Sequence, residues 1–175
     1  MKDENSEELY EFIVDYDERI YANEERREDS LIQQAAHMQT VFSFMSAAIL
    51  MVAAIVVEYR ANLSLEYLLV VFTTILATLL ASLFCATKAQ KRYTREAFQD
   101  AADFQKYVER GRHLLVTKKQ RYKYIADTYA KLHPSLRKVN DRRVEWIECS
   151  MKLFQAALAL CVLAFVASVI LLLKQ

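Results

Sequence analysis

The histidines, which often serve as catalytic bases or metal ligands, are three in number and far apart. His37, His113 and His133 form neither an HxxxH nor an HExxH pair, the spacing that places two zinc ligands on one helical face. The single glycine, Gly111, gives no glycine-rich loop of the kind that binds phosphate. The sequence therefore predicts no enzyme, no catalytic residue, no cofactor and no bound metal.

The three cysteines, Cys85, Cys149 and Cys161, include no CxxC pair. That spacing is typical of zinc sites and of redox-active dithiols, so the sequence gives no support for metal binding or redox pairing. Cys85 and Cys161 lie in apolar stretches, where cysteine behaves as a small apolar residue.

Hydroxyl groups recur along one of these apolar stretches. Thr74, Thr78 and Ser82 follow one another at intervals of four residues, which places them on one side of a helix. This stripe has two interpretations, and the sequence leaves both open. Its small side chains allow another helix to pack closely, or its hydroxyls line a weakly selective aqueous pore in a ring of subunits.

Three uncharged stretches of 20 or 21 residues dominate the sequence: Met38–Val57, Tyr67–Thr87 and Leu153–Leu173. A helix of that length covers the roughly 30 Å of hydrocarbon in a bilayer. With one glycine and one proline in 175 residues, the chain has few signals for turns or strands. The sequence predicts an all-α, multi-span helical membrane protein. Because these spans hold no Asp, Glu, His or Arg, an ion-coupled transporter or a proton relay is disfavoured.

Lysine and arginine flank these spans mainly on one side. Since positively charged loops stay in the cytoplasm, we expect the N-terminus and residues 88–150 to be cytoplasmic. An aromatic residue before the third span fits an anchor at the same membrane surface. The predicted membrane-interface residues are Lys88, Lys91, Arg92, Arg95, Arg142, Arg143 and Trp146.

Apolar residues at helical intervals predict long cytoplasmic helices that are continuous with the spans. We expect one helix from Tyr67 to Arg110, and another from Leu114 to Leu132 that stops at Pro134. The predicted segments are an acidic cytoplasmic helix (1–34), a two-span transmembrane hairpin (35–87), a basic cytoplasmic helical region (88–150) and a third transmembrane helix (151–175).

The net charge of +1 conceals two oppositely charged segments. Residues 1–30 hold 12 acidic and 4 basic side chains, whereas residues 88–152 hold 17 basic and 8 acidic ones. Either the acidic helix packs on the basic segment, in the same chain or in a neighbour, or the basic segment faces anionic lipid and the acidic helix is solvated. With an acidic layer close by, we expect no stable DNA binding.

Apolar faces on the cytoplasmic helices need a partner. Leu9, Phe12 and Tyr16 recur at helical intervals on the acidic helix. Further residues predicted to serve in oligomer or helix packing are Phe98, Phe104 and Tyr129. A symmetric homo-oligomer in the lipid bilayer is the simplest arrangement for a small chain of this kind.

The order of these segments resembles two families of small bacterial membrane proteins. An N-terminal helix "DYDERIYANEERRED" precedes a tight two-span hairpin, and "ATKAQKRYTREAFQDAADFQKYVER" follows it. This arrangement is similar to SLATT-type effectors of bacterial conflict systems and to the Csx-type membrane accessory protein of type VI-B CRISPR systems. The resemblance implies an inner-membrane effector in antiviral defence, switched on by a separate CRISPR or nucleotide-sensing activator.

Two features depart from those families. The third apolar stretch exceeds what a two-span effector needs. The accessory family is associated with a HEPN ribonuclease motif, an arginine followed after four to six residues by a histidine, and no histidine here has an arginine at that distance upstream. Ribonuclease activity is therefore not expected.

Two hypotheses follow for the function of the chain. In the first, a homo-oligomer forms a pore or otherwise permeabilises or depolarises the membrane. In the second, a non-conducting membrane scaffold recruits a cytoplasmic or RNA-handling partner through its basic helices.

Overall fold

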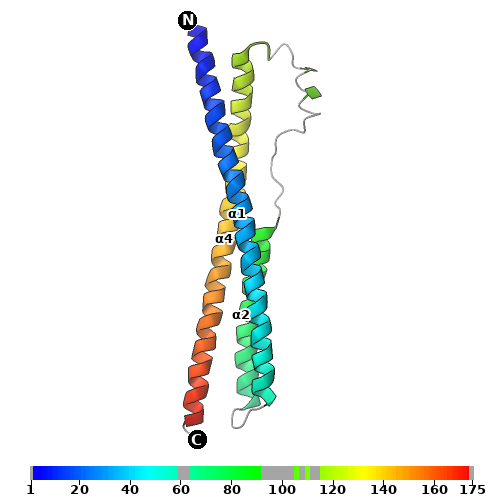
Figure 1. Cartoon of the computed structure of the whole chain (residues 1–175), viewed down its shortest axis with the longest axis vertical. Coiled ribbons are helices and arrows are strands. Elements are labelled where there is room, and N and C mark those ends of the chain that lie inside the picture. Colours follow the sequence, from blue (N-terminus) through cyan, green and yellow to red (C-terminus); the bar gives the residue numbers. More distant parts are fainter. Residues whose placement is uncertain (1, 59–63, 92–104, 107–108, 111–114, 174–175) are drawn as a thin grey trace. The chain divides into compact units, whose positions relative to one another are not determined.

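The described part of the chain forms three long α-helices in the computed structural model (Figure 1). They are α1 (Lys2–Glu58), α2 (Leu65–Gln90) and α4 (Lys118–Leu173). The structure describes residues 2–58, 64–91, 105–106, 109–110 and 115–173, and no strand occurs among them. The all-α prediction is therefore confirmed. All three helices are long and apolar enough to cross a membrane.

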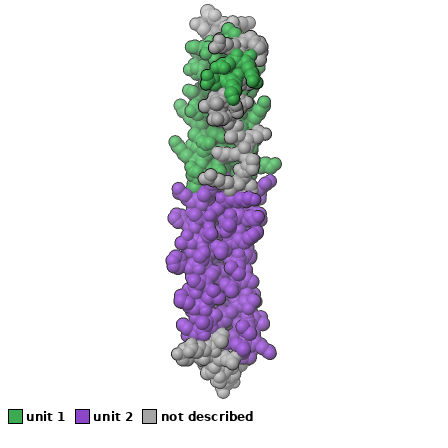
Figure 2. All heavy atoms as spheres, turned by 90° about the vertical axis from the view of Figure 1, so that its right-hand side faces the viewer, with its two compact units in different colours: residues 1–30, 92–141 green, residues 31–91, 142–175 purple. Residues whose placement is uncertain are grey.

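The contacts divide the chain into two compact units, coloured separately in Figure 2. Unit 1 comprises Met1–Ser30 and Arg92–Asp141, and unit 2 comprises Leu31–Lys91 and Arg142–Gln175. Helices α1 and α4 each contribute residues to both units. The predicted acidic segment and the first apolar stretch both belong to α1, which is one continuous helix.

In unit 1, α1 packs on α4 through a small apolar cluster. Tyr21 of α1 is buried with Leu132 and Leu136 of α4. The ring of Tyr129 packs on this cluster, with its centroid 5.6 Å from that of Tyr21. Leu9 and two neighbouring apolar residues of α1 stay exposed, so the face that they form is not the one that α4 covers.

Helix α4 passes through Pro134, where the sequence predicted that a helix would stop. That prediction is wrong. A proline inside a helix lacks one backbone hydrogen bond and costs about 3 kcal/mol. Leu132 and Leu136, on either side of the proline, are both buried against Tyr21. Each buried leucine contributes about 1.5–3 kcal/mol, so the packing of a continuous helix offsets the cost of Pro134.

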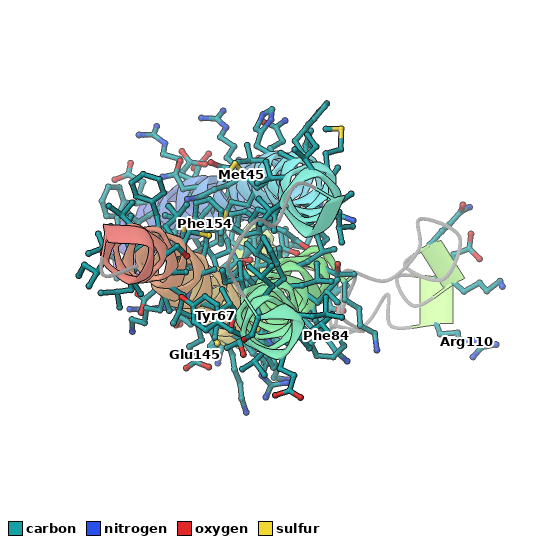
Figure 3. The ribbon with its side chains drawn as sticks, turned by 90° about the horizontal axis from the view of Figure 1, so that it is seen from below. Met45, Tyr67, Phe84, Arg110, Glu145 and Phe154 are labelled. Carbon is teal, nitrogen blue, oxygen red and sulfur yellow. The ribbon has the colours of Figure 1, made fainter. Side chains whose placement is uncertain are left out.

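In unit 2, all three helices share two apolar clusters. The first joins Phe42 of α1, Ala86 of α2 and Ile147 of α4. The ring of Phe42 stacks on that of Phe154, with 4.4 Å between the centroids. Figure 3 shows the labelled Phe154 directed in among the helices. The second cluster comprises Ile75 and Leu79 of α2 and Ala157 of α4, with Ile49 of α1 packed against it.

Helix α2 begins at a serine cap and ends earlier than the sequence predicted. The Ser64 hydroxyl accepts a hydrogen bond of 3.3 Å from the backbone N–H of Tyr67, which satisfies a donor that the first turn leaves unpaired. The helix ends at Gln90, and Lys91 has the extended ψ angle of 129°. The prediction of one helix from Tyr67 to Arg110 is therefore wrong at Lys91.

Helix α4 begins after a capping box. The Thr117 hydroxyl accepts a hydrogen bond of 3.2 Å from the backbone N–H of Gln120, and the Gln120 side chain accepts one of 3.1 Å from the backbone N–H of Thr117. Each side chain thus satisfies a donor that the helix would leave unpaired. The helix starts at Lys118, four residues after the predicted start at Leu114.

The apolar segments are mostly exposed on this single chain. In the most apolar 18-residue stretch of each helix, the buried share is only 6% for α1, 28% for α2 and 6% for α4. Large side chains such as Phe44, Val70 and Phe165 lie at the surface. A monomer in water rarely exposes so much contiguous apolar area, so these surfaces need lipid or another protein chain.

Candidate functional site

The predicted hydroxyl stripe does not keep to one face in the structure. Thr74 is exposed, Thr78 is half-buried and Ser82 is fully buried. The hydroxyls of Thr74 and Thr78 donate hydrogen bonds of 2.8 Å to carbonyls of their own helix, at Val70 and Thr74. Thr74 is thus at the surface of the single chain, whereas Ser82 belongs to the interior.

Ser82 marks the point where α2 crosses α4. Its hydroxyl donates to the backbone carbonyl of Ser150, and the Ser150 hydroxyl donates to the carbonyl of Ser82, both at 2.8 Å. The two hydroxyl oxygens are 3.2 Å apart. Both residues are fully buried. A side-chain bond to the opposite backbone requires the two helices to approach closely, which only small residues allow.

Beside this crossing, the structure brings two cysteines together. The Cys85 thiol donates a hydrogen bond to the Cys149 sulfur, with 3.6 Å between the two sulfur atoms. Cys85 is buried, Cys149 is exposed, and both are free thiols. No sequence pattern predicts such a pair, because the two residues come from different helices and share no CxxC spacing.

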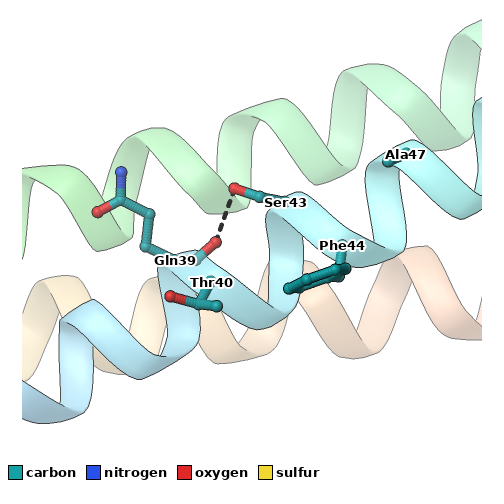
Figure 4. A pocket seen from close by; sticks show the side chains of 5 residues that line it. All are labelled: Gln39, Thr40, Ser43, Phe44 and Ala47. Atoms are coloured by element: carbon teal, nitrogen blue, oxygen red, sulfur yellow. Dashed lines mark hydrogen bonds between the residues drawn. The ribbon is translucent and has the colours of Figure 1, made fainter.

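A polar contact also joins α1 to α2. The Gln90 side-chain amide donates a hydrogen bond of 2.7 Å to the Gln39 side-chain oxygen. A shallow hollow of about 430 Å³ lies beside Gln39 on α1, and Figure 4 shows the residues that line it. They are Gln39, Thr40, Ser43, Phe44 and Ala47.

The hydroxyls along this hollow are satisfied by their own helix. Ser43 donates to the Gln39 carbonyl at 2.8 Å, drawn as a dashed line in Figure 4, and Thr40 donates to the Ala36 carbonyl at 3.1 Å. Because Ala36, Thr40, Ser43 and Ala47 are also exposed, α1 carries a face of small residues that the other described helices leave largely uncovered.

The predicted basic membrane-interface residues occupy different environments. The Lys88 ammonium lies 5.2 Å from the centre of the Phe84 ring, in reach of a cation–π contact, and Figure 3 shows Phe84 at the outside of the helices. Lys91 and Arg142 are exposed. Arg92 and Arg95 lie outside the described residues.

Arg143 and Trp146 of this set turn inward. Arg143 is fully buried and donates a hydrogen bond of 3.3 Å to the backbone carbonyl of Lys91. Trp146 is half-buried and packs on the cluster that contains Phe42. Arg143 therefore holds the residue that follows the C-terminal end of α2 against α4.

Of the predicted oligomer or helix-packing residues, Tyr129 packs within unit 1, and Phe98 and Phe104 lie outside the described residues. Burial of the Tyr129 ring, followed by the neighbouring Glu18 carboxylate, raises the pKa of its hydroxyl. Tyr129 is therefore a packing residue of the α1–α4 pair.

The acidic helix contacts the basic start of α4 within unit 1. The Lys118 ammonium lies 3.5 Å from the Glu7 carboxylate, and the Tyr122 hydroxyl donates a hydrogen bond of 3.1 Å to Glu11. The first interpretation of the charge pattern, packing of acidic helix on basic segment, is thus confirmed for the described part of residues 88–152. These groups are exposed enough that each pair contributes little free energy.

A buried amide anchors the other end of this unit. The fully buried Asn140 side chain donates hydrogen bonds of 2.9 Å to both the carbonyl and the carboxylate of Glu24. Beside it, the Arg27 guanidinium donates a hydrogen bond of 3.1 Å to Asp141. The charge pattern alone did not single out Asn140, because the residue is neutral.

The cavity among the three helices of unit 2 is apolar. It has a volume of about 580 Å³, and its lining includes Ile49, Val71 and Leu158. Across the described residues, no group of three histidine, cysteine or acidic side chains is placed to hold a metal ion. An apolar cavity offers an ion no substitute for its hydration shell.

No protein-family model, curated protein or solved structure matches this chain.

Proposed function

We propose that the chain is a homo-oligomeric effector of the bacterial inner membrane, in which several copies surround a pore that permeabilises or depolarises the membrane during antiviral defence. The apolar segments of α1, α2 and α4 form the spans. The observation that carries the proposal is the exposed small and hydroxyl-bearing surface of these segments, at Thr74 on α2 and at Thr40 and Ser43 on α1.

Lipid favours the burial of this surface against other protein chains. Between helices in a bilayer the hydrophobic effect gives no net attraction, because lipid tails are themselves apolar. Association depends instead on close packing, which small residues allow. Ala36, Thr40, Ser43 and Ala47 form such a face on α1 and are exposed on the single chain. A second copy that packs on this face covers the hollow beside Ser43.

The pore lies between copies, because the cavity among the three helices of unit 2 is apolar and offers ions no polar lining. Hydroxyl side chains at a subunit interface provide weak hydrogen-bonding partners for water and hydrated ions. Thr74 fits that role, since its side chain is exposed and its hydroxyl bonds only to a carbonyl of its own helix. Conduction through such a lining is weakly selective.

The N-terminus and residues 88–150 face the cytoplasm in this proposal. The positive charge of residues 88–152 supports that orientation, since basic loops are retained on the cytoplasmic side. The resemblance to SLATT-type effectors and to the type VI-B accessory protein supports a role in defence, with a separate CRISPR or nucleotide-sensing activator. Ion flux through the purified protein in liposomes tests the proposal.

A second function, a non-conducting membrane scaffold, is favoured by one observation. Leu9, Phe12 and Tyr16 form an exposed apolar face on the acidic helix, as expected of a surface that recruits a cytoplasmic partner. Replacement of Phe12 by Asp separates the two functions. The scaffold loses its activity in cells and its partner, whereas the pore keeps its ion flux in liposomes.

A further inference from the structure

We infer that Cys85 and Cys149 form an oxidation site, in which a peroxide converts the two thiols to a disulfide that links α2 to α4. The sulfur atoms already lie 3.6 Å apart, and a disulfide requires about 2.05 Å. Both residues are free thiols in this structure, so the bond is available to form.

The neighbouring serines hold the two helices close together beside the cysteines. Ser82 lies one turn before Cys85 on α2, and Ser150 directly follows Cys149 on α4. Their paired hydrogen bonds of 2.8 Å fix the backbones close together. Rotation of the cysteine side chains can therefore close the remaining gap with little movement of either helix.

Exposure decides which thiol reacts first. Cys149 is exposed and lines a surface hollow with Glu148 and Lys152, whereas Cys85 is buried. The Cys149 thiolate attacks one peroxide oxygen, the O–O bond breaks, and one water leaves after protonation. The product is a sulfenic acid at Cys149.

The buried thiol then resolves this intermediate. The sulfur of Cys85 attacks the sulfur of Cys149, the S–O bond breaks, and the thiol proton of Cys85 leaves with the hydroxide as a second water. In total, two thiols lose two electrons and two protons, and one peroxide is reduced to two waters. A dithiol reductant reverses the reaction.

The third cysteine lies too far away to compete within one chain. Cys161 is 12 residues beyond Cys149 on the same helix, about 18 Å along its axis. It lines the apolar cavity of unit 2. The native chain thus contains its own control, because Cys161 should stay reduced while Cys85 and Cys149 pair.

The oxidation site is independent of pore formation. It depends on the proposed orientation only in that Cys149 must face cytoplasmic peroxide. Its chemical consequence is a covalent link where α2 crosses α4, so the two helices can no longer separate at that point. A reversible link of this kind restricts any rearrangement of the spans that requires the crossing to open. Its detection requires no ion flux.

The test uses the full-length chain in detergent micelles, reduced and then treated with hydrogen peroxide. Trypsin places the three cysteines in separate peptides, Ala61–Lys88, Val144–Lys152 and Leu153–Lys174. We expect the intact chain to lose two hydrogen atoms, and the first two peptides to be linked. A mixture of light and isotope-labelled chains should give links within one chain only.

The Cys85→Ser variant provides the matched control. It should accumulate sulfenic acid at Cys149, which a carbon nucleophile traps, and give no linked peptide. The inference is overturned if the native chain keeps its mass, if Cys149 is over-oxidised without a link, or if light and labelled chains are joined through Cys149. The masses, the linked peptides and the trapped sulfenic acid do not depend on ion flux, so a failure of the pore proposal in liposomes does not change them.

Discussion

Ser82 of α2 and Ser150 of α4 each donate a hydrogen bond of 2.8 Å to the backbone carbonyl of the other residue. This reciprocal arrangement is possible because both side chains are small, and it leaves no room for anything larger, since both residues are fully buried. The crossing of α2 and α4 is therefore marked by two buried hydroxyl groups, that of Ser82 within an apolar stretch and that of Ser150 just before one.

Loss of one of these hydroxyls should weaken the chain moderately, and an increase in size should weaken it more. Ser82→Ala removes hydrogen bonds worth about 0.6 kcal/mol on average and up to about 1.7 kcal/mol between membrane helices. Ser82→Leu adds overpacking of about 1–3 kcal/mol. The free energy of unfolding in detergent micelles measures both.

Ser43→Ala is the control for Ser82→Ala. The Ser43 hydroxyl is exposed and bonds only to the carbonyl of Gln39 on its own helix, so its removal should change the free energy of unfolding by less than about 0.5 kcal/mol. Equal effects of the two alanine variants would show that the serine crossing contributes nothing special to stability.

Asn140 should matter more for unit 1 than the ion pairs around it. Asn140→Ala removes two hydrogen bonds to Glu24 and leaves buried polar groups unpaired, at a cost of about 1–3 kcal/mol. Lys118→Ala removes an exposed ion pair worth no more than about 1 kcal/mol. Hydrogen exchange of the amides in residues 118–141 reports the loss as faster opening.

Higher salt provides a second test of the same contrast. Because salt screens exposed charges, it should weaken the contribution of Lys118 and leave that of Asn140 nearly unchanged. The interpretation is wrong if Lys118→Ala accelerates exchange as much as Asn140→Ala does, or if both effects disappear with salt.

The Tyr122 hydroxyl gives the contact between the acidic helix and α4 a dependence on pH. Its hydrogen bond to Glu11, with smaller effects of burial and of the Glu11 charge, raises the pKa of Tyr122. A raised pKa means that the folded state holds the proton more tightly. The stabilisation is therefore complete below the ordinary tyrosine pKa of about 10 and is lost as the pH rises through the higher folded value.

Glu11→Ala should lower the pKa of Tyr122 towards the ordinary value, whereas Glu8→Ala, at a nearby exposed position, should have a much smaller effect. NMR titration of a chain with isotope-labelled tyrosine rings measures the change, and Tyr122→Phe assigns the signal. A pKa that is the same with and without Glu11 would exclude this hydrogen bond in solution.

The fold could be predicted from the sequence where the signal is long and uniform. Three uncharged stretches of 20 or 21 residues identified the three helices. The end of α2 at Gln90 could not be predicted, because neither glycine nor proline occurs among the charged residues that follow. The continuity of α4 through Pro134 could not be predicted either, because proline is a strong local signal for the end of a helix. The packing of Leu136 in the α1–α4 cluster overrides that signal.

The burial of the hydroxyl stripe and the pairing of the cysteines could not be predicted from the sequence, because both depend on how the helices rotate and pack. Each step of four residues advances about 40° beyond a full turn, so a stripe of three such residues rotates by about 80°. That rotation carries the row from exposed Thr74 to buried Ser82. The Cys85–Cys149 pair requires the antiparallel register of α2 against α4, which no local spacing reports.

The orientation of the chain in the membrane can be tested with Cys149. In a variant with Cys149 as its sole cysteine, a membrane-impermeant maleimide should label inside-out vesicles and not intact spheroplasts, because the proposed orientation places residues 88–150 on the cytoplasmic side. A variant that retains only Cys161 should resist labelling from both sides. Labelling of Cys149 in intact spheroplasts would reverse the proposed orientation.

Thr74 tests whether the exposed hydroxyls line the pore. Thr74→Leu should lower conductance severalfold while the oligomer keeps its size on a gel-filtration column, because the substitution narrows and dries the lining without touching the packing within the chain. Leu80→Ile changes an exposed apolar residue of the same helix and should have little effect. Equal conductance of the two variants would make Thr74 a lipid-facing or packing residue.

Ion flux through the purified native chain in liposomes tests the central claim most directly. The account predicts that liposomes containing the oligomer dissipate an imposed ion gradient, that empty liposomes keep it, and that bacteria depolarise when the activating system is switched on. A correctly sized oligomer that gives no flux in liposomes, together with cells that keep their membrane potential under activation, would contradict it.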